Sequence, residues 1–259
     1  MLQKVRLVWA IILLVLIGCK TSEKPVIATA ELVQIQVLAT LHKFHLTNPN
    51  YSYEKVTQLI QQFDPDIIAI EIRPEDLQED STYLAQFYPL EMRQVLKDFP
   101  SEKVRGLDWY GNEAAGKTMA PGVFKNEQTE LGKIKKLERE LNQDSLLAPK
   151  LTAVAELGKK QAALAKVSSP AKLNNGEYDK ITDAFYQTLE AATHGTRYQT
   201  YTDFNRLRDQ IITENIVELV KENPGKRIII LVGANHRSRA VKVLQQLPSD
   251  KVRLVPVED

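Results

Sequence analysis

The chain alternates between short apolar runs and longer stretches in which apolar residues recur at helical spacing. The apolar runs predict buried strands at residues 35–40, 67–72, 104–107, 227–232 and 252–257. Helical spacing is clearest in residues 53–63, where Val56, Leu59, Ile60 and Phe63 form one stripe. The same spacing predicts helices at residues 83–99, 179–193, 201–222 and 238–247.

The order of these elements indicates the fold class. Strand, helix and strand follow one another at both ends of the chain, which is typical of parallel β-α-β units. The runs have apolar residues on both faces, as strands need when helices cover both faces of their sheet. We therefore expect an α/β fold with a mainly parallel central sheet covered by helices, in a single domain at residues 31–259.

The middle of the chain has a different pattern. Residues 126–166 are rich in Lys, Glu, Leu and Ala, and their apolar positions keep helical spacing. We expect one or two amphipathic helices here, with a break near Pro149, followed by a loop at residues 167–176. Residues 126–176 are thus a predicted helical insertion in the α/β domain.

The N-terminal segment has the pattern of a signal peptide. Two basic residues precede an apolar stretch at residues 7–17, which is too short to span a bilayer comfortably. The stretch ends in Leu16-Ile17-Gly18-Cys19, which resembles a bacterial lipobox. The resemblance implies removal of residues 1–18, acylation of Cys19, and a tether at residues 19–30. The alternatives are an ordinary signal peptide and a short membrane anchor.

Composition narrows the function classes. The 259 residues carry a formal net charge of +1, so there is no basic excess to neutralise nucleic-acid phosphates. Cys19 is the only cysteine, and its acylation leaves no thiol for a disulfide or for nucleophilic catalysis. The expected partners are a membrane of the bacterial cell envelope, reached through the lipid anchor, and a small-molecule or peptide substrate.

Polar side chains gather where the predicted strands end. Ligands of open parallel sheets bind beyond the carboxyl ends of the strands, so one site built from several strand ends is expected there. Three of the four histidines of the chain belong to this set. Its members are His42, His45, Glu71, Arg73, Asp108, Asn235 and His236.

The residue types in this set limit the chemistry. Glu71 stands in an apolar run, and a buried carboxylate needs a partner such as Arg73, a histidine or a metal ion. His42, Glu71 and His236 are suitable ligands for a divalent metal ion, and equally suitable as a general base with its orienting carboxylate. The chain has no Gly-x-Ser-x-Gly elbow, Gly-rich phosphate loop or His-Glu-x-x-His motif. Reaction by an activated water is therefore the expected enzymatic class.

Three segments carry a resemblance to a known superfamily. They are Ala39-Thr40-Leu41-His42, Pro65-Asp66-Ile67-Ile68-Ala69-Ile70-Glu71-Ile72-Arg73 and Val232-Gly233-Ala234-Asn235-His236, with Asn205-Arg206-Leu207-Arg208-Asp209-Gln210 before the last. In order and spacing they resemble the motifs of the TraB/Tiki and erythromycin esterase–ChaN-like superfamily. Ala39 departs from the pattern, because the superfamily has a glycine there. The middle insertion resembles no particular branch.

The resemblance implies a site and a choice of functions. The implied catalytic residues are His42, Glu71, Arg73, Arg208 and His236, with His45, Asp108 and Asn235 as substrate-binding candidates. The branches include metal-dependent proteases, esterases of macrolide lactones and haem-binding lipoproteins. A divalent metal ion is the first cofactor to consider, and haem is the alternative.

Each candidate also has a structural interpretation. A histidine at a strand end is often a hydrogen-bonded structural residue, and His45 is as well explained by lining its loop. Arg73 can pair with Glu71 or Glu75, and Asp108 can cap a helix. His194 fits the end of a helix, where the dipole favours a cation. Of Arg206 and Arg208, one is expected to lie on a solvated helix face, and Arg208 is the candidate for the site.

Three functional hypotheses follow. The first is a hydrolase of the cell envelope that activates water at His42, Glu71 and His236 to cleave an ester or peptide bond. The second is a lipoprotein without enzymatic activity that binds haem or another small molecule, with histidine as an axial ligand. The third is a member of the same scaffold that has lost activity. The site itself requires that the side chains of His42, Glu71 and His236 converge in space, and side chains in separate packed environments would exclude it.

Overall fold

The computed structural model describes residues 32–259, and the predicted signal peptide, Cys19 and tether lie outside them. The five strands of the sheet are β1 (Val33–Thr40), β2 (Ile67–Ile70), β3 (Val104–Gly106), β4 (Arg227–Gly233) and β5 (Val252–Leu254). All pairings are parallel, in the order β3-β2-β4-β1-β5. The predicted α/β class with a parallel central sheet is confirmed.

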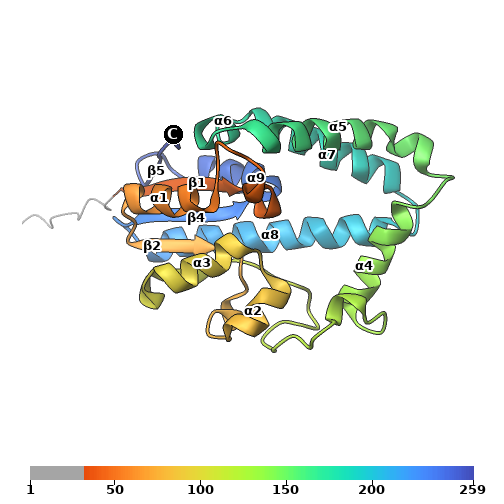
Figure 1. The fold of residues 1–259 in the computed structure, drawn as a ribbon, viewed down its shortest axis with the longest axis horizontal. Helices are drawn as coiled ribbons and strands as arrows, with labels where there is room; N and C mark the ends of the chain where they lie inside the picture. The colour runs from red at the N-terminus through yellow and green to blue at the C-terminus, as the bar shows by residue number, and fades with distance from the viewer. Residues whose placement is uncertain (1–31) are drawn as a thin grey trace, which may run out of the picture.

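Helices cover both faces of this sheet and continue beyond it (Figure 1). They are α1 (Tyr53–Phe63), α2 (Ser81–Phe87), α3 (Leu90–Asp98), α4 (Glu130–Leu141), α5 (Ala148–Val167), α6 (Pro170–Leu173), α7 (Glu177–Thr193), α8 (Gln199–Glu222) and α9 (Ala234–Gln245). Short 3-10 helices are η1 (His42–Leu46), η2 (Pro74–Asp76), η3 (Ser101–Lys103) and η4 (Val123–Lys125). Between residues 32 and 259, no helix combines the length and apolar character needed to cross a membrane.

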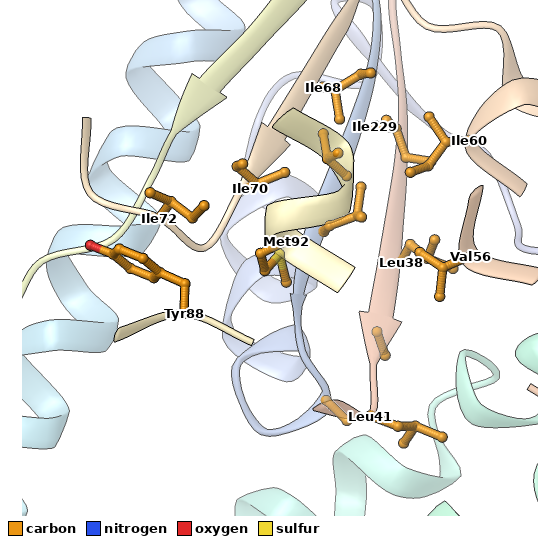
Figure 2. Packing of buried hydrophobic residues seen from close by; sticks show 14 of the residues in the cluster. Leu38, Leu41, Val56, Ile60, Ile68, Ile70, Ile72, Tyr88, Met92 and Ile229 are labelled. Atoms are coloured by element: carbon orange, nitrogen blue, oxygen red, sulfur yellow. The ribbon is translucent and has the colours of Figure 1, made fainter. Parts of the chain in front are cut away.

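The first face of the sheet packs against α1 and α3. Leu38, Ile68 and Ile229 lie on this face, fully buried. Figure 2 shows Val56 and Ile60 from α1, with Met92 from α3, closing over them. The other face carries the alternate strand residues and packs against α8 and α9. Helices on both faces explain why the central strands β2 and β4 are almost entirely apolar.

A helical projection extends from the carboxyl edge of the sheet (Figure 1). Helices α5 and α7 pack along each other in it, and α4 lies at its far end beside α8. Its small core consists of Leu141, Val154, Leu189 and Tyr198. The projection includes α7 and the N-terminal part of α8 in addition to α4 and α5 of the predicted insertion at residues 126–176. The end of that insertion returns to the sheet, where the predicted loop contains α6 and contacts β1. The helical structure is interrupted between Leu141 and Ala148, and Pro149 lies in the first turn of α5.

Several element boundaries differ from those expected. The helix predicted at residues 83–99 is two helices, because Pro89 lacks a backbone N–H and holds Tyr88 in an extended conformation between them. Strand β2 ends at Ile70, so Glu71 comes after the strand. Helix α9 begins directly after Gly233, which places His236 in its first turn instead of in a loop.

Register brings the strand ends together. Thr40 at the end of β1 pairs with Gly233 at the end of β4, and Ile70 pairs with Leu231 one strand further on. The residues that follow β1, β2 and β4 therefore leave the sheet side by side. This edge is where the candidate site lies.

Truncation of Ile229 tests the assignment of the core. Ile229→Ala removes a fully buried side chain between the sheet and its helices, and we expect a loss of about 2–5 kcal/mol in the free energy of unfolding. Urea unfolding measures it. The matched control is Leu146→Ala, whose side chain is 89% exposed, with an expected change within about 0.5 kcal/mol. Equal effects of the two substitutions would contradict the packing described.

Candidate functional site

A buried ion pair between Glu71 and Arg208 lies at the centre of the carboxyl edge. Nη2 of Arg208 donates to Oε1 of Glu71 over 2.8 Å, and the backbone N–H of Gly233 donates to Oε2 over 2.6 Å. Burial by itself raises the pKa of Glu71, but the charges of His236, Arg208 and His42 outweigh it and lower this pKa to about 2. Glu71 is therefore an anion at neutral pH.

Arg208 is held in place by Asp108. Nε and Nη2 of the guanidinium donate to the two carboxylate oxygens over 2.8 and 2.7 Å, a bidentate pair. The guanidinium also lies over the ring of Tyr110, 5.0 Å from its centroid. The Asp108 side chain is fully buried. Asp108 therefore positions Arg208 and has no exposed oxygen for the substrate contact expected of it.

His236 contacts the same ion pair from α9. Its Nε2 lies 3.4 Å from Oε1 of Glu71, while Nδ1 bonds to Oδ1 of Asp209 over 2.5 Å. Nε of Arg239 holds the other oxygen of Asp209 over 3.0 Å. Burial lowers the pKa of His236, but the charge of Glu71 and the bond to Asp209 outweigh it, so this pKa lies above 6.5.

His42 stands on the opposite side of the pair, just after β1. Its Nδ1 bonds to Oε1 of Glu91 over 2.7 Å. The Glu91 side chain is fully buried, whereas that of His42 is 44% exposed. Burial lowers the pKa of His42, but the hydrogen bond to Glu91 and the charge of Glu71 raise it above 6.5. The backbone of His42 has φ 51°, a left-handed conformation that is uncommon outside glycine and is often found at functional sites.

Gly233 permits the close approach of the two groups. A Cβ atom at position 233 would lie 2.7 Å from Nε2 of His42 and 3.3 Å from Oε2 of Glu71. Both groups thus occupy space that any other residue would fill. The glycine is needed here for this approach, since its own φ of −52° is open to any residue.

A cavity of about 130 Å³ opens beside these residues. His42 and His236 line it together with Asn235, Gly233 and the start of α9. The remaining lining residues are Thr40, Leu41, Phe44, Ala165, Tyr178 and Ala234. The cavity therefore brings both imidazoles and a helix N-terminus to one small space at the strand ends.

Arg73 does not reach this cluster. Its guanidinium is 1% exposed and makes a bidentate pair with Asp76, together with bonds to the carbonyl oxygens of Ala114 and Lys117. Glu75 lies 3.1 Å away. All three guanidinium nitrogens of Arg73 thus donate hydrogen bonds that connect η2 to the loop at residues 114–117. The structural interpretation of Arg73 as an ion-pair residue fits these contacts, although its main partner is Asp76.

His45 is likewise committed to the backbone. It is buried, Nε2 accepts from the N–H of Leu41 over 2.9 Å, and Nδ1 donates to the carbonyl oxygen of Tyr51 over 2.8 Å. Burial lowers its pKa, so the ring is neutral. Neither nitrogen is left for a substrate. His194 is the C-cap of α7, as its helix-end interpretation predicts.

Three residues that contribute to the site were not among the candidates predicted from the sequence. Glu91, Asp209 and Arg239 orient the histidines or their partners. Asp209 follows Arg208 in a resembling motif, which is a usable signal. Glu91 has only a weak one, since it shares the buried face of α3 with Val95 four residues later.

A divalent cation suits His42, Glu71 and His236 poorly in this arrangement. Both oxygens of Glu71 are hydrogen-bonded, one of them to the guanidinium of Arg208, whose charge repels a metal ion at the same carboxylate. Nε2 of His236 lies 3.5 Å from Nη1 of that guanidinium. Within residues 32–259, no group of three or more His, Cys, Asp or Glu side chains is placed to hold a metal ion. The chemistry that these residues fit is acid–base chemistry.

Comparison with known proteins leaves the family open. No protein-family model, curated protein or solved structure matches the chain.

Enlargement of Gly233 tests the geometry around His42. In Gly233→Ala the new methyl group overlaps Nε2 of His42, so we expect a loss of about 1–3 kcal/mol in the free energy of unfolding and a shifted NMR signal for the His42 ring. Gly158→Ala in α5 is the control, because its Cβ meets only Phe185 at 3.6 Å. It should keep or raise stability. If Gly233→Ala left the free energy of unfolding as high as Gly158→Ala does, the close approach of His42 to Gly233 would be refuted.

Removal of the Glu91 charge tests its hold on His42. In Glu91→Gln we expect the pKa of His42 to fall, because burial then acts without the carboxylate that opposes it. NMR titration of the ring signals measures the shift. Glu54→Gln on the exposed side of α1 is the control and should leave the titration of His42 unchanged.

The same substitution changes the pH dependence of stability. Because the folded pKa of His42 exceeds 6.5, its pairing stabilises the wild type fully below pH 6.5, and this contribution is lost as pH rises through the folded value. Unfolding of Glu91→Gln should lose this part of the pH dependence. An unaltered pH profile would contradict the pairing.

Proposed function

We propose that the protein is a hydrolase that activates water at a His/Glu site and cleaves an ester or peptide bond. One observation carries the proposal. Two histidines, each with Nδ1 bound to a buried carboxylate, flank the Glu71–Arg208 ion pair and line one cavity. An imidazole oriented by a carboxylate is the usual form of a general acid or base in hydrolysis.

His42 is the base of this proposal. Its bond to Glu91 engages Nδ1, so the neutral ring has its lone pair on Nε2, at the cavity. Nε2 takes a proton from water as the water oxygen attacks the carbonyl carbon, and Glu91 stabilises the imidazolium that forms. The 44% exposure of the side chain gives the proton a route to solvent afterwards.

His236 is the acid, and Arg208 the fixed charge. The charge of Glu71 and the bond to Asp209 raise the pKa of His236 and so favour its imidazolium, which in this proposal donates its Nε2 proton to the leaving group. Arg208 and the N-terminus of α9 favour the negative charge that develops on the carbonyl oxygen. Oε1 of Glu71 contacts both Arg208 and His236 and so fixes their positions relative to each other.

The resemblance to the TraB/Tiki and erythromycin esterase–ChaN-like superfamily supports the same class. The residues that converge, His42, Glu71, Arg208 and His236, lie in its resembling motifs. A lipoprotein of that kind, anchored through Cys19, would act in the bacterial cell envelope. The proposal includes this location in the cell envelope. Dependence on a divalent metal ion remains a prediction that rests on the resemblance alone.

Binding of haem is less well supported. Pockets for ligands of drug size enclose roughly 300–1,000 Å³, whereas the cavity beside His42 and His236 encloses about 130 Å³. A small polar group fits this space.

Hydrolysis of probe substrates by the full-length chain tests the proposal. We expect turnover in a panel of p-nitrophenyl esters and fluorogenic peptides, and a fall in kcat of about 10²- to 10⁴-fold in His42→Gln. His194→Gln, at the exposed end of α7, is the control and should keep wild-type turnover. Activity should persist after dialysis against EDTA.

Glu91→Gln sharpens the assignment of the base. Because Glu91 raises the pKa of His42, the acidic limb of the pH–rate profile should move to lower pH in this variant. Turnover that is equal in His42→Gln and wild type would remove His42 as the base. Absence of turnover across the whole panel would count against the hydrolase.

A further inference from the structure

The helical projection reaches the candidate site at one point. Ala165 of α5 and Tyr178 of α7 line the same cavity as His42, and the hydroxyl of Tyr178 bonds to Asn235 in the first turn of α9. One wall of the cavity therefore belongs to the projection, while the catalytic histidines belong to the sheet edge. A contact at this wall couples the two parts.

That contact fixes the side-chain amide of Asn235. Its Oδ1 accepts from the hydroxyl of Tyr178 over 3.0 Å and from Nε2 of Gln161 over 3.1 Å. Nε2 of Gln161 also donates to Oγ1 of Thr182 over 2.9 Å. Tyr178, Gln161 and Thr182 are all buried, so their positions are set by the packing of α5 on α7.

Because two donors bind Oδ1 of Asn235, the nitrogen of the amide, Nδ2, is the end that faces a ligand. Within residues 32–259, the hydrogen bonds of Asn235 use its oxygen and leave out Nδ2. Asn235 itself is exposed and lines the cavity. Nδ2 is thus an oriented hydrogen-bond donor in the cavity that His42 and His236 also line, and the residues that orient it are Tyr178 and Gln161.

The lining of the cavity indicates what this donor suits. None of its lining residues is Asp or Glu, and the first turn of α9 adds backbone N–H groups that helix geometry leaves without intrahelical partners. A group that only accepts hydrogen bonds matches such a set. The carbonyl oxygen of an ester or amide is such a group, and it gains negative charge during attack by water.

We propose that Nδ2 of Asn235 binds the carbonyl oxygen of the substrate acyl group, and that Tyr178 and Gln161 are positioning residues for it. The helical projection thereby contributes to substrate recognition through Asn235. The identity of the acyl group rests on the proposed hydrolase, whereas the orientation of the amide does not. The two parts are tested separately.

Kinetics of the full-length chain with p-nitrophenyl acetate test the carbonyl contact. Loss of one such donor costs about 10²- to 10³-fold in kcat, which we expect for Asn235→Ala. Tyr178→Phe keeps the ring and removes one of the two bonds to Oδ1, so we expect a smaller fall in kcat with KM unchanged. The matched control is Tyr201→Phe, whose hydroxyl bonds to Glu138 in the projection, with wild-type kinetics expected.

NMR of the side-chain amide tests the orientation without turnover. In the 15N-labelled chain, the Asn235 NH2 signals are assigned by their loss in Asn235→Ser and titrated with sodium acetate, with sodium chloride at equal ionic strength as the control. We expect acetate to shift these signals in wild type, and to shift them less in Tyr178→Phe.

The two measurements separate the outcomes. Wild-type kcat in Asn235→Ala would overturn the carbonyl contact while leaving the hydrolase intact. Absence of hydrolysis in wild type, together with shifted amide signals, would leave an oriented donor for a carboxylate or carbonyl and remove the hydrolase. Acetate that shifts the signals of the histidine rings and leaves those of Asn235 unchanged would overturn the proposal.

Discussion

The buried charge of Glu71 is the constraint on which the rest of the site depends. An ionised carboxylate at the edge of an apolar sheet is costly unless cations and N–H donors surround it. Arg208, His236 and the N–H of Gly233 supply them, from α8, α9 and the end of β4. Helix α8 and the junction of β4 with α9 are therefore held at a carboxylate that is far from both in sequence. Loss of one partner from such a buried pair costs about 3–5 kcal/mol.

Three further carboxylates orient the basic groups that surround Glu71. Asp108 orients Arg208, Asp209 orients His236, and Glu91 orients His42. Each of the three basic groups near Glu71 thus has a carboxylate behind it, which fixes the orientation of that group. The result is two imidazoles with Nδ1 engaged. One is largely buried beside the ion pair, and the other is half exposed at the cavity.

Sequence reasoning located this site because its main signal is topological. Parallel strands end at one edge, so His42, Glu71 and His236 had to leave the sheet near one another once the strands were recognised. The same reasoning could not distinguish His42 from His45. Three residues of chain separate them, but the 3-10 turn of η1 directs one ring to Glu91 and the other to the backbone of Leu41 and Tyr51.

Other features depend on packing that no local pattern encodes. Arg73 is two residues from Glu71, yet its guanidinium is taken by Asp76 in the turn that follows. Glu91 reaches His42 only because α3 packs against η1, and a lone glutamate in an amphipathic helix gives only a weak sign of this contact. The start of α9 directly after Gly233 was also missed, because the Gly-Ala-Asn-His segment has the composition of a turn.

The central claim is that His42 and His236 act in one site. A double-mutant cycle on probe hydrolysis tests it most directly, with His42→Gln, His236→Gln and the variant that carries both. Groups that serve the same transition state are strongly non-additive, so the double variant should be about as slow as the slower single variant. Two effects that simply multiply would show that the histidines act independently and would contradict the account.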